Sequence, residues 1–485
     1  MRLSSYSQES PTADRPAGLS GNPARDLARS FNIRVIFFLS LHIPLALVAN
    51  LSPWISAAYA LIALLYGLRA ALSGRTSQVV YAVSYIAAGE VLWRMTHAYL
   101  FWEFSKYAAV LILFIAIIIE WNRKPSTRRL RSISPVVLMA AFVPAIAYTT
   151  LVAGVAEARD QLSFNLSSYL MIAISALYLW ARPIDYNTTV RMLLAILAPV
   201  VAITSLAIYL TVLDMSRLVF IGESNWITSG NYGPNQVSNM MGFGAFVAIA
   251  LFIMMPRAWG ARIFVLLLSV VMLIQGLLTF SRGGIYSFIL ALGVFSFHLM
   301  RTPKARGRLV LLFAVFTALL ALVVYPTLEQ FTAGGLAQRF TDLNTTGRFE
   351  AAQIDLEAFL DNPFLGVGVG QADAYRAEYF GKPVAAHTEF TRLLGEHGVF
   401  GIVVLAILAW MILKRYLAND PGMARAIAAG FSVWGLSVMV HAATRLAAVP
   451  LALSLAFVFW KVKAETEPVE PEHGLLIRPD ERILQ

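Results

Sequence analysis

The sequence contains no cysteine, and only 14% of its 485 residues are charged. The absence of cysteine excludes disulfide bridges and cysteine-ligated metal sites. A soluble domain carries roughly 25% charged residues. This deficit, together with many apolar runs of about 20 residues, excludes an ordinary soluble domain and indicates a polytopic membrane protein.

Motifs of several common enzyme classes are also missing. The seven histidines show neither His-x-x-x-His spacing nor a two-histidine-plus-carboxylate pattern, so we expect no metal site. The sequence has no Walker loop and no Gly-x-Ser-x-Gly nucleophile motif. We therefore expect no cofactor, and neither P-loop nor serine-hydrolase chemistry.

Hydrophobic residues make up 58% of the chain and predict an all-α polytopic membrane protein with about 12–14 transmembrane helices. The first apolar run begins near Ile33, after a polar arm, which predicts a first span rather than a cleavable signal peptide. The fourteen candidate spans are 33–50, 53–72, 77–93, 98–120, 134–156, 161–181, 190–213, 236–255, 259–280, 283–300, 307–326, 399–414, 425–441 and 445–460.

The formal net charge of +10 would suit nucleic-acid binding, but the positions of the cations favour membrane topology instead. With a cytoplasmic amino terminus, most of the 38 lysines and arginines fall in cytoplasmic segments. An odd number of wrongly assigned spans would reverse the later loops and destroy this pattern. The sequence thus predicts an even number of spans with both termini in the cytoplasm.

This topology divides the chain into five parts. We expect a disordered cytoplasmic arm at 1–32, eleven spans in 33–326, a long outer loop with short helices and catalytic residues at 327–398, further spans in 399–460, and a cytoplasmic tail at 461–485. Eleven cations lie within spans or on the outer side of the membrane, where the topology does not explain them: Arg94, Lys106, Arg159, Arg217, Arg282, Arg339, Arg348, Arg376, Lys382, Arg392 and Arg445.

The end of the long loop holds the strongest candidate for chemistry. Residues 388–398 predict a short helix in which Glu389, Arg392 and Glu396 share one face. His387 directly precedes that helix, where the positive end of the helix dipole disfavours imidazolium. A neutral imidazole can accept a proton from an attacking hydroxyl. The alternative is a capping or hydrogen-bonded loop histidine beside a solvated charged face; His397, at the helix end, is expected to be structural.

Two glycine-rich stretches also lie on the predicted outer face. Arg282, in the turn Ser281-Arg282-Gly283 between two spans, is costly there without an anionic partner. Its guanidinium matches phosphate oxygens; the alternative is that it snorkels to the interface. The run 365–370 is no dinucleotide fingerprint, because no strand precedes it. We expect it to form a tight turn, with backbone amides near an anion as a second possibility.

Membrane-located carboxylates support a rival class, a transporter. Glu90 and Glu103 lie within predicted spans, where a transporter could use them. Alternatively, they pair with Arg94 and Lys106, four and three residues further along.

Three motifs together resemble the O-antigen ligase and polymerase superfamily. The first is Ser281-Arg282-Gly283, the second is Gly347-Arg348 followed by Asn362-Pro363-Phe364-Leu365-Gly366, and the third is Ala386-His387-Thr388-Glu389 followed by Leu393-Leu394-Gly395-Glu396 before a span. The family typically has asparagine or serine after the histidine, where this chain has Thr388. The family also often has an arginine shortly before its Pro-Asn pair; residues 226–232 lack one, and Arg217 is the candidate replacement.

The resemblance implies a membrane-embedded, metal-independent, inverting glycosyltransferase of the C type in the bacterial inner membrane. The donor would be a glycan on undecaprenyl pyrophosphate at the periplasmic face. The acceptor would be lipid A-core sugar in a ligase, or another lipid-linked repeat in an O-antigen or exopolysaccharide polymerase. His387 would be the catalytic base. Arg282, Arg348 and Arg217 would bind the pyrophosphate, and the supporting residues would be Glu389, Arg392, Glu396 and Asn235. The remaining alternative is a flippase of lipid-linked oligosaccharide.

Overall fold

The computed structural model of the chain describes residues 23–123, 131–255, 258–301, 303–342, 347–382 and 384–462. Most of the predicted arm at 1–32 and nearly all of the predicted tail at 461–485 lie outside these residues, as do Thr346 and Pro383. The first helix begins at Pro23, well before Ile33.

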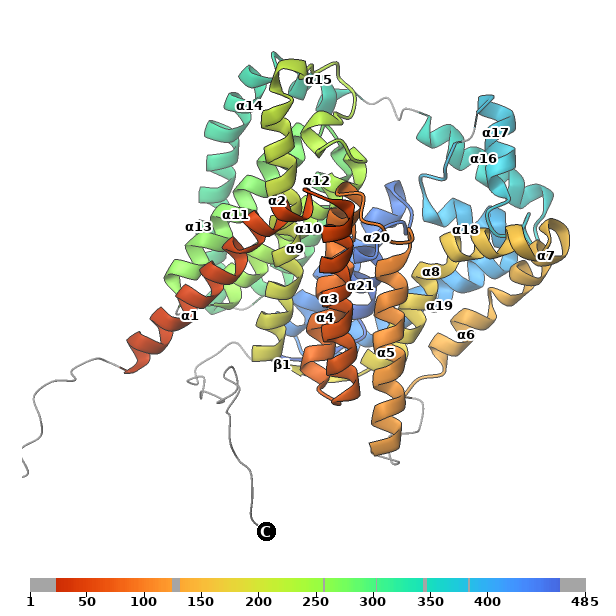
Figure 1. Cartoon of the computed structure of the whole chain (residues 1–485), viewed down its shortest axis with the longest axis horizontal. Helices are drawn as coiled ribbons and strands as arrows, with labels where there is room; N and C mark the ends of the chain where they lie inside the picture. The colour runs from red at the N-terminus through yellow and green to blue at the C-terminus, as the bar shows by residue number, and fades with distance from the viewer. Residues whose placement is uncertain are drawn as a thin grey trace, which may run out of the picture.

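The described residues are almost entirely helical (Figure 1). In chain order, the described α-helices up to residue 319 are α1 (Pro23–Ser40), α2 (His42–Ala49), α3 (Pro53–Leu72), α4 (Thr76–Met95), α5 (Phe104–Arg123), α6 (Ser134–Ala140), α7 (Val143–Ala153), α8 (Val155–Leu179), α9 (Tyr186–Leu213), α10 (Pro234–Met254), α11 (Trp259–Leu278), α12 (Arg282–Met300) and α13 (Pro303–Leu319). The remaining helices are α14 (Tyr325–Phe331), α15 (Gly335–Thr341), α16 (Arg348–Asp361), α17 (Ala372–Phe380), α18 (Glu389–His397), α19 (Val399–Ala418), α20 (Met423–His441) and α21 (Ala448–Leu455).

Within the described part of the chain, 12 helices are long and apolar enough to cross a membrane. This confirms the predicted all-α polytopic fold. Helices α9 and α10 form the centre of the bundle, since nearly every residue of α10 is buried. The outer helix α3 instead keeps much of its apolar surface exposed, and Val310 and Val315 of α13 are exposed as well, as expected of helices that face lipid tails.

Two of the fourteen predicted spans differ from a regular apolar helix. The segment 77–93 is part of α4, which has 20 residues but fails the hydropathy required of a span. Most of α4 is buried among other helices, so its polar side chains do not meet lipid. The predicted span 445–460 is wrong as a continuous helix: α21 has only 8 residues.

The segment that contains α21 still runs through the interior of the bundle. After α21 the chain forms β2 (Phe459–Lys461), which pairs in parallel with β1 (Pro183–Asp185). Residues 446–458 are all buried. Irregular backbone is tolerated at membrane depth where protein rather than lipid surrounds it. Because the segment is buried, its side chains are still mostly apolar, and hydropathy alone therefore suggested an ordinary span.

The short helices of the predicted long loop gather at one end of the bundle, hereafter the site end. Helices α14 to α17 lie at the top of Figure 1, and β1 lies at the opposite end. The loop 442–447, between α20 and α21, reaches α18 at this end, because the Thr444 amide donates to the Glu389 carboxylate. The site end therefore joins segments that are far apart in the sequence.

Candidate active site

His387 lies directly before α18, whose N-cap is Thr388. The histidine is half-buried, and its ring has no hydrogen-bond partner among the described residues. Burial, followed by the positive charges of Arg348, Arg445 and Arg376, lowers the pKa of His387 to about 4. The ring is therefore neutral near pH 7 and can accept a proton. Burial and the neighbouring arginines act in the same direction as the helix dipole invoked from the sequence.

The backbone leading to His387 is held by two of these arginines. Arg376 of α17 donates to the Val384 carbonyl at 2.8 Å, and Arg445 donates to the Ala386 carbonyl at 2.7 Å. Arg376 is fully buried and pairs with Asp355 and Asp373. The segment before His387 is thereby fixed to α17 on one side and to the loop 442–447 on the other.

The charged face of α18 is buried, so the expectation of a solvated face is wrong. Arg392 contacts Glu389 at 2.5 Å and Glu396 at 2.6 Å. We call these three residues the ion triad. Burial alone would raise the pKa of Glu389, but Arg392, the Tyr169 hydroxyl and the Thr444 amide together lower it. Burial raises the pKa of Glu396 to about 7. Both side chains thus form ion pairs with Arg392, and neither is hydrogen-bonded to His387 within the part of the chain that the structure describes.

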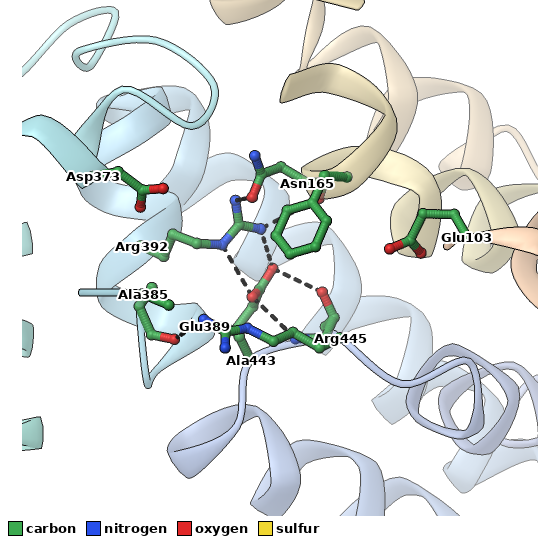
Figure 2. A pocket seen from close by; sticks show the side chains of 11 residues that line it. Glu103, Asn165, Asp373, Ala385, Glu389, Arg392, Ala443 and Arg445 are labelled. Atoms are coloured by element: carbon green, nitrogen blue, oxygen red, sulfur yellow. Dashed lines mark hydrogen bonds and ion pairs between the residues drawn. The ribbon is translucent and has the colours of Figure 1, made fainter. Parts of the chain in front are cut away.

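Glu389 joins three separate segments, and Figure 2 shows its side chain beside that of Arg392. Its carboxylate accepts from the Tyr169 hydroxyl of α8 at 2.8 Å and from the Thr444 hydroxyl at 3.1 Å. The Thr444 amide donates to it as well, at 3.2 Å. Because α18, α8 and the loop 442–447 meet at this one carboxylate, the ion triad fixes the position of α18 and so of the histidine before it.

A second group of cations lies at the start of α12. Arg282 donates to the carbonyls of Arg339 and Asp342, and Arg339 donates to the Phe280 carbonyl at 2.9 Å. Arg348 is the first residue of α16. We call Arg282, Arg339 and Arg348 the basic cluster. Burial, and then repulsion between these guanidiniums, lowers the pKa of both Arg339 and Arg348. Such a cluster favours a bound anion.

The fold brings the basic cluster to His387. The charges of Arg339 and Arg282 act on Arg348, and the charge of Arg348 acts on His387. Three residues predicted from three separate motifs, Arg282, Arg348 and His387, therefore share one region. Sequence reasoning missed the parts of Arg339, Arg376 and Arg445. The only signal for them was their place among the cations that topology did not explain.

The turn at Arg282 is packed against α20. A Cβ atom on Gly283 would overlap the His441 ring, and the His441 Nε2 lies 3.1 Å from the Ser287 hydroxyl. Asn235 of α10 accepts from the Ser281 hydroxyl at 3.3 Å and donates to the His441 carbonyl at 3.4 Å. Asn235 thus braces the turn that presents Arg282, while its functional role stays a prediction.

Arg217 lies elsewhere on the surface. It belongs to the short 3-10 helix Met215–Arg217, and its side chain is 80% exposed and 3.6 Å from Asp214. Nothing in the described residues links its guanidinium to the basic cluster. The structure therefore brings Arg348 near His387 and Arg282 near Arg348, but it does not bring Arg217 there.

The glycine run at 365–370 closes the end of α18, as expected of a turn. The Val367 amide donates to the Gly395 carbonyl at 2.9 Å and the Gly368 amide to the Glu396 carbonyl at 3.1 Å. Gly366 has φ of 70°, and a Cβ atom there would overlap the backbone of α18. His397 is fully buried with its ring 5.0 Å from that of Phe142. Its burial and packing fit the expected structural role.

The carboxylates that had suggested a transporter are paired within the protein. Glu90 contacts Arg94 at 2.9 Å, and Glu103 contacts Lys106 at 2.5 Å. This confirms the alternative pairing predicted from their spacing. Among the residues the structure describes, no group of three histidine, aspartate or glutamate side chains is arranged to hold a metal ion.

Residues 267–406 match the model of a protein family described as O-Antigen ligase. The matched segment runs from α11 to α19 and contains His387 and the whole basic cluster. This part of the chain is an O-antigen ligase family domain, and the chain is thus a membrane enzyme of the glycosyltransferase type. No curated protein matches the chain.

Proposed function

We propose that this chain, whose residues 267–406 form an O-antigen ligase family domain, transfers a glycan from undecaprenyl pyrophosphate to a sugar hydroxyl. The observation that carries the proposal is a half-buried histidine, neutral and without a hydrogen-bond partner in the described chain, near Arg348 of the basic cluster. A base and an anion site side by side are what this transfer requires.

The basic cluster would bind the donor pyrophosphate. Negative charge on the leaving pyrophosphate grows as the bond to the sugar breaks, and preorganised cations stabilise that charge best where water is excluded. Arg282 and Arg339 are held by backbone carbonyls, so they need little rearrangement when the donor binds. The three guanidiniums would supply the positive charge for the leaving group.

His387 would accept the proton of the acceptor hydroxyl. As that oxygen attacks the anomeric carbon, the carbon–oxygen bond to pyrophosphate breaks and the proton passes to the imidazole. The products are the glycosylated acceptor, undecaprenyl pyrophosphate and a protonated His387. A direct displacement of this kind inverts the anomeric centre.

We also propose an orientation in which the site end is periplasmic. The distribution of lysine and arginine supports a cytoplasmic amino terminus, and His387 then lies outside the inner membrane. No nucleotide sugar is available there, which favours a lipid-linked donor. Acceptors of two kinds fit: lipid A-core sugar in a ligase, and a second lipid-linked repeat in a polymerase.

The test replaces His387 by alanine in the host and measures the chain length of the glycan that remains on the lipid carrier. We expect transfer to fall by at least about 10²-fold, the usual contribution of a positioned base. Long chains stranded on the carrier would identify a ligase, and single repeats accessible from outside would identify a polymerase.

A matched control is His97→Asn, because His97 is exposed and has a positive φ that asparagine tolerates. Membrane levels and melting temperatures of both variants verify folding. Undiminished glycan transfer by folded His387→Ala would remove the histidine from the mechanism and favour the flippase alternative, for which transfer is not the direct activity.

A further inference from the structure

A small pocket of about 40 Å³ lies between α8, α18 and the loop 442–447 (Figure 2). Its rim includes the exposed side chains of Phe164 and Asp373. Its floor includes the buried side chains of Glu389, Arg392 and Glu103. An open rim above a buried polar floor is the form of a small recognition site.

The charges of the floor are already balanced within the protein. Glu389 and Arg392 belong to the ion triad, and Glu103 contacts Lys106 at 2.5 Å and the Ser167 hydroxyl at 3.1 Å. Three of the lining residues are carboxylic acids. A pyrophosphate would meet repulsion here, in contrast to the basic cluster, so this pocket suits a neutral, hydroxyl-bearing group.

Arg445 is the lining cation with donors to spare. Its side chain makes one hydrogen bond within the described chain, to the Ala386 carbonyl, whereas a guanidinium carries five N–H donors. The carbonyl that Arg445 contacts belongs to Ala386, which lines the pocket and directly precedes His387. A hydroxyl group bound by Arg445 would therefore sit beside the proposed base.

The rim offers the other elements of sugar recognition. Phe164 is 45% exposed and presents an aromatic surface on which the apolar face of a sugar ring can pack. The Asp373 side chain is 59% exposed; one carboxylate oxygen pairs with Arg376, and the other can accept from hydroxyl groups. A volume of about 40 Å³ holds one edge of a sugar together with a water, rather than a whole ring.

We propose that this pocket is the acceptor subsite: it takes one hydroxyl-bearing edge of the acceptor sugar, with Phe164 against the ring, Asp373 and Arg445 on its hydroxyls, and the reacting hydroxyl turned toward His387. The inference rests on the proposed function. It divides the region around His387 into a donor side at the basic cluster and an acceptor side at the pocket.

The test measures initial rates of glycan transfer with the purified full-length protein in liposomes of host lipid. The probes are the lipid-linked glycan of the host as donor, and host lipid A-core or lipid-linked single repeat as acceptor, each titrated separately. For Phe164→Ala we expect the KM for the acceptor to rise about tenfold, with the KM for the donor within about twofold of wild type. Phe164→Tyr, which keeps the ring, restores the acceptor KM.

Tyr379→Ala is the control, because Tyr379 is an aromatic residue of α17 that is 65% exposed and does not line the pocket. A second variant, Asp373→Asn, is expected to raise the acceptor KM without changing the donor KM. An unchanged acceptor KM in Phe164→Ala and Asp373→Asn, or equal changes for donor and acceptor, would overturn the subsite.

His387→Ala in the same assay separates the two proposals. If His387→Ala abolishes transfer while the rim variants behave as wild type, only the acceptor subsite is wrong. If folded His387→Ala transfers glycan normally, the proposed function fails first.

Discussion

The ion triad and the basic cluster differ in what balances the charge of their arginines. Arg392, in the ion triad, lies between two buried carboxylates at 2.5 and 2.6 Å. In the basic cluster, Arg282 and Arg339 donate to backbone carbonyls, and the carboxylates of Asp342 and Glu223 act on Arg339. Arg348 has two arginines and no carboxylate among the groups that shift its pKa.

This difference separates architecture from ligand binding. A buried charge with internal partners fixes the position of a helix, and its removal leaves the partner charge uncompensated. Cations gathered without enough carboxylates repel one another, and a bound anion relieves that repulsion. The ion triad therefore fixes the helix that follows His387, whereas the basic cluster is the proposed site for the donor.

The largest expected effect is on stability, at the ion triad. Glu389→Gln should destabilise the protein by about 3–5 kcal/mol, the usual result of breaking a buried ion pair. Thermal unfolding in detergent, followed by intrinsic fluorescence, measures this loss. The control is Glu357→Gln on α16, because the Glu357 side chain is exposed. Equal melting temperatures for the two variants would show that the ion triad does not stabilise the fold.

The next effect is on catalysis, at the basic cluster. Arg348→Ala should reduce kcat/KM by about 10²–10³-fold, as expected when one donor to the developing charge is lost. The melting temperature should not fall, because repulsion is relieved. Arg348→Lys keeps the charge and should retain part of the activity. A stable Arg348→Ala protein with nearly full activity would show that the cluster is not the donor site.

The pH dependence links the cluster to the base. Since the pKa of His387 is lowered to about 4, the ring is neutral above that value. Activity should therefore persist at mildly acidic pH and fall as pH drops through about 4. Arg348→Ala removes one cause of the lowered pKa, so the acid limb of its residual activity should move to higher pH. An unshifted limb would mean that Arg348 does not act on His387.

The smallest expected effect is at Arg217, which is exposed and paired with Asp214. Arg217→Ala should change the transfer rate by no more than about twofold, in keeping with the small contribution of surface ion pairs. The measurement is the rate of transfer under saturating donor. A loss as large as that of Arg348→Ala would return Arg217 to the donor site, where the sequence motif suggested it.

Much of the fold could be predicted from hydropathy, because a helix that faces lipid must be apolar along its length. The segments that departed from the prediction are those surrounded by protein. The helix α4 could carry Glu90 and Arg94, since other side chains rather than lipid contact them. For the same reason the segment around α21 could depart from regular helix.

The candidate site could be predicted only in part. His387 and Arg348 stood in recognisable motifs, but Arg339 and Arg445 had no motif and became part of the site through their contacts with Phe280 and Ala386. The charged face of α18 could be predicted from the spacing of its residues, yet the burial of that face depends on Tyr169 and the loop 442–447. Spacing within a helix says nothing about which distant segment covers it.

The sequence by itself determined that this protein lies in a membrane, that its helices are apolar, and that His387 precedes a short charged helix, because composition and local spacing govern all three. The tertiary structure alone decided which charges pair with one another and which like charges lie close together. Those outcomes depend on distances between segments that lie far apart in the chain, and electrostatic energy follows distance in space and burial rather than separation in sequence.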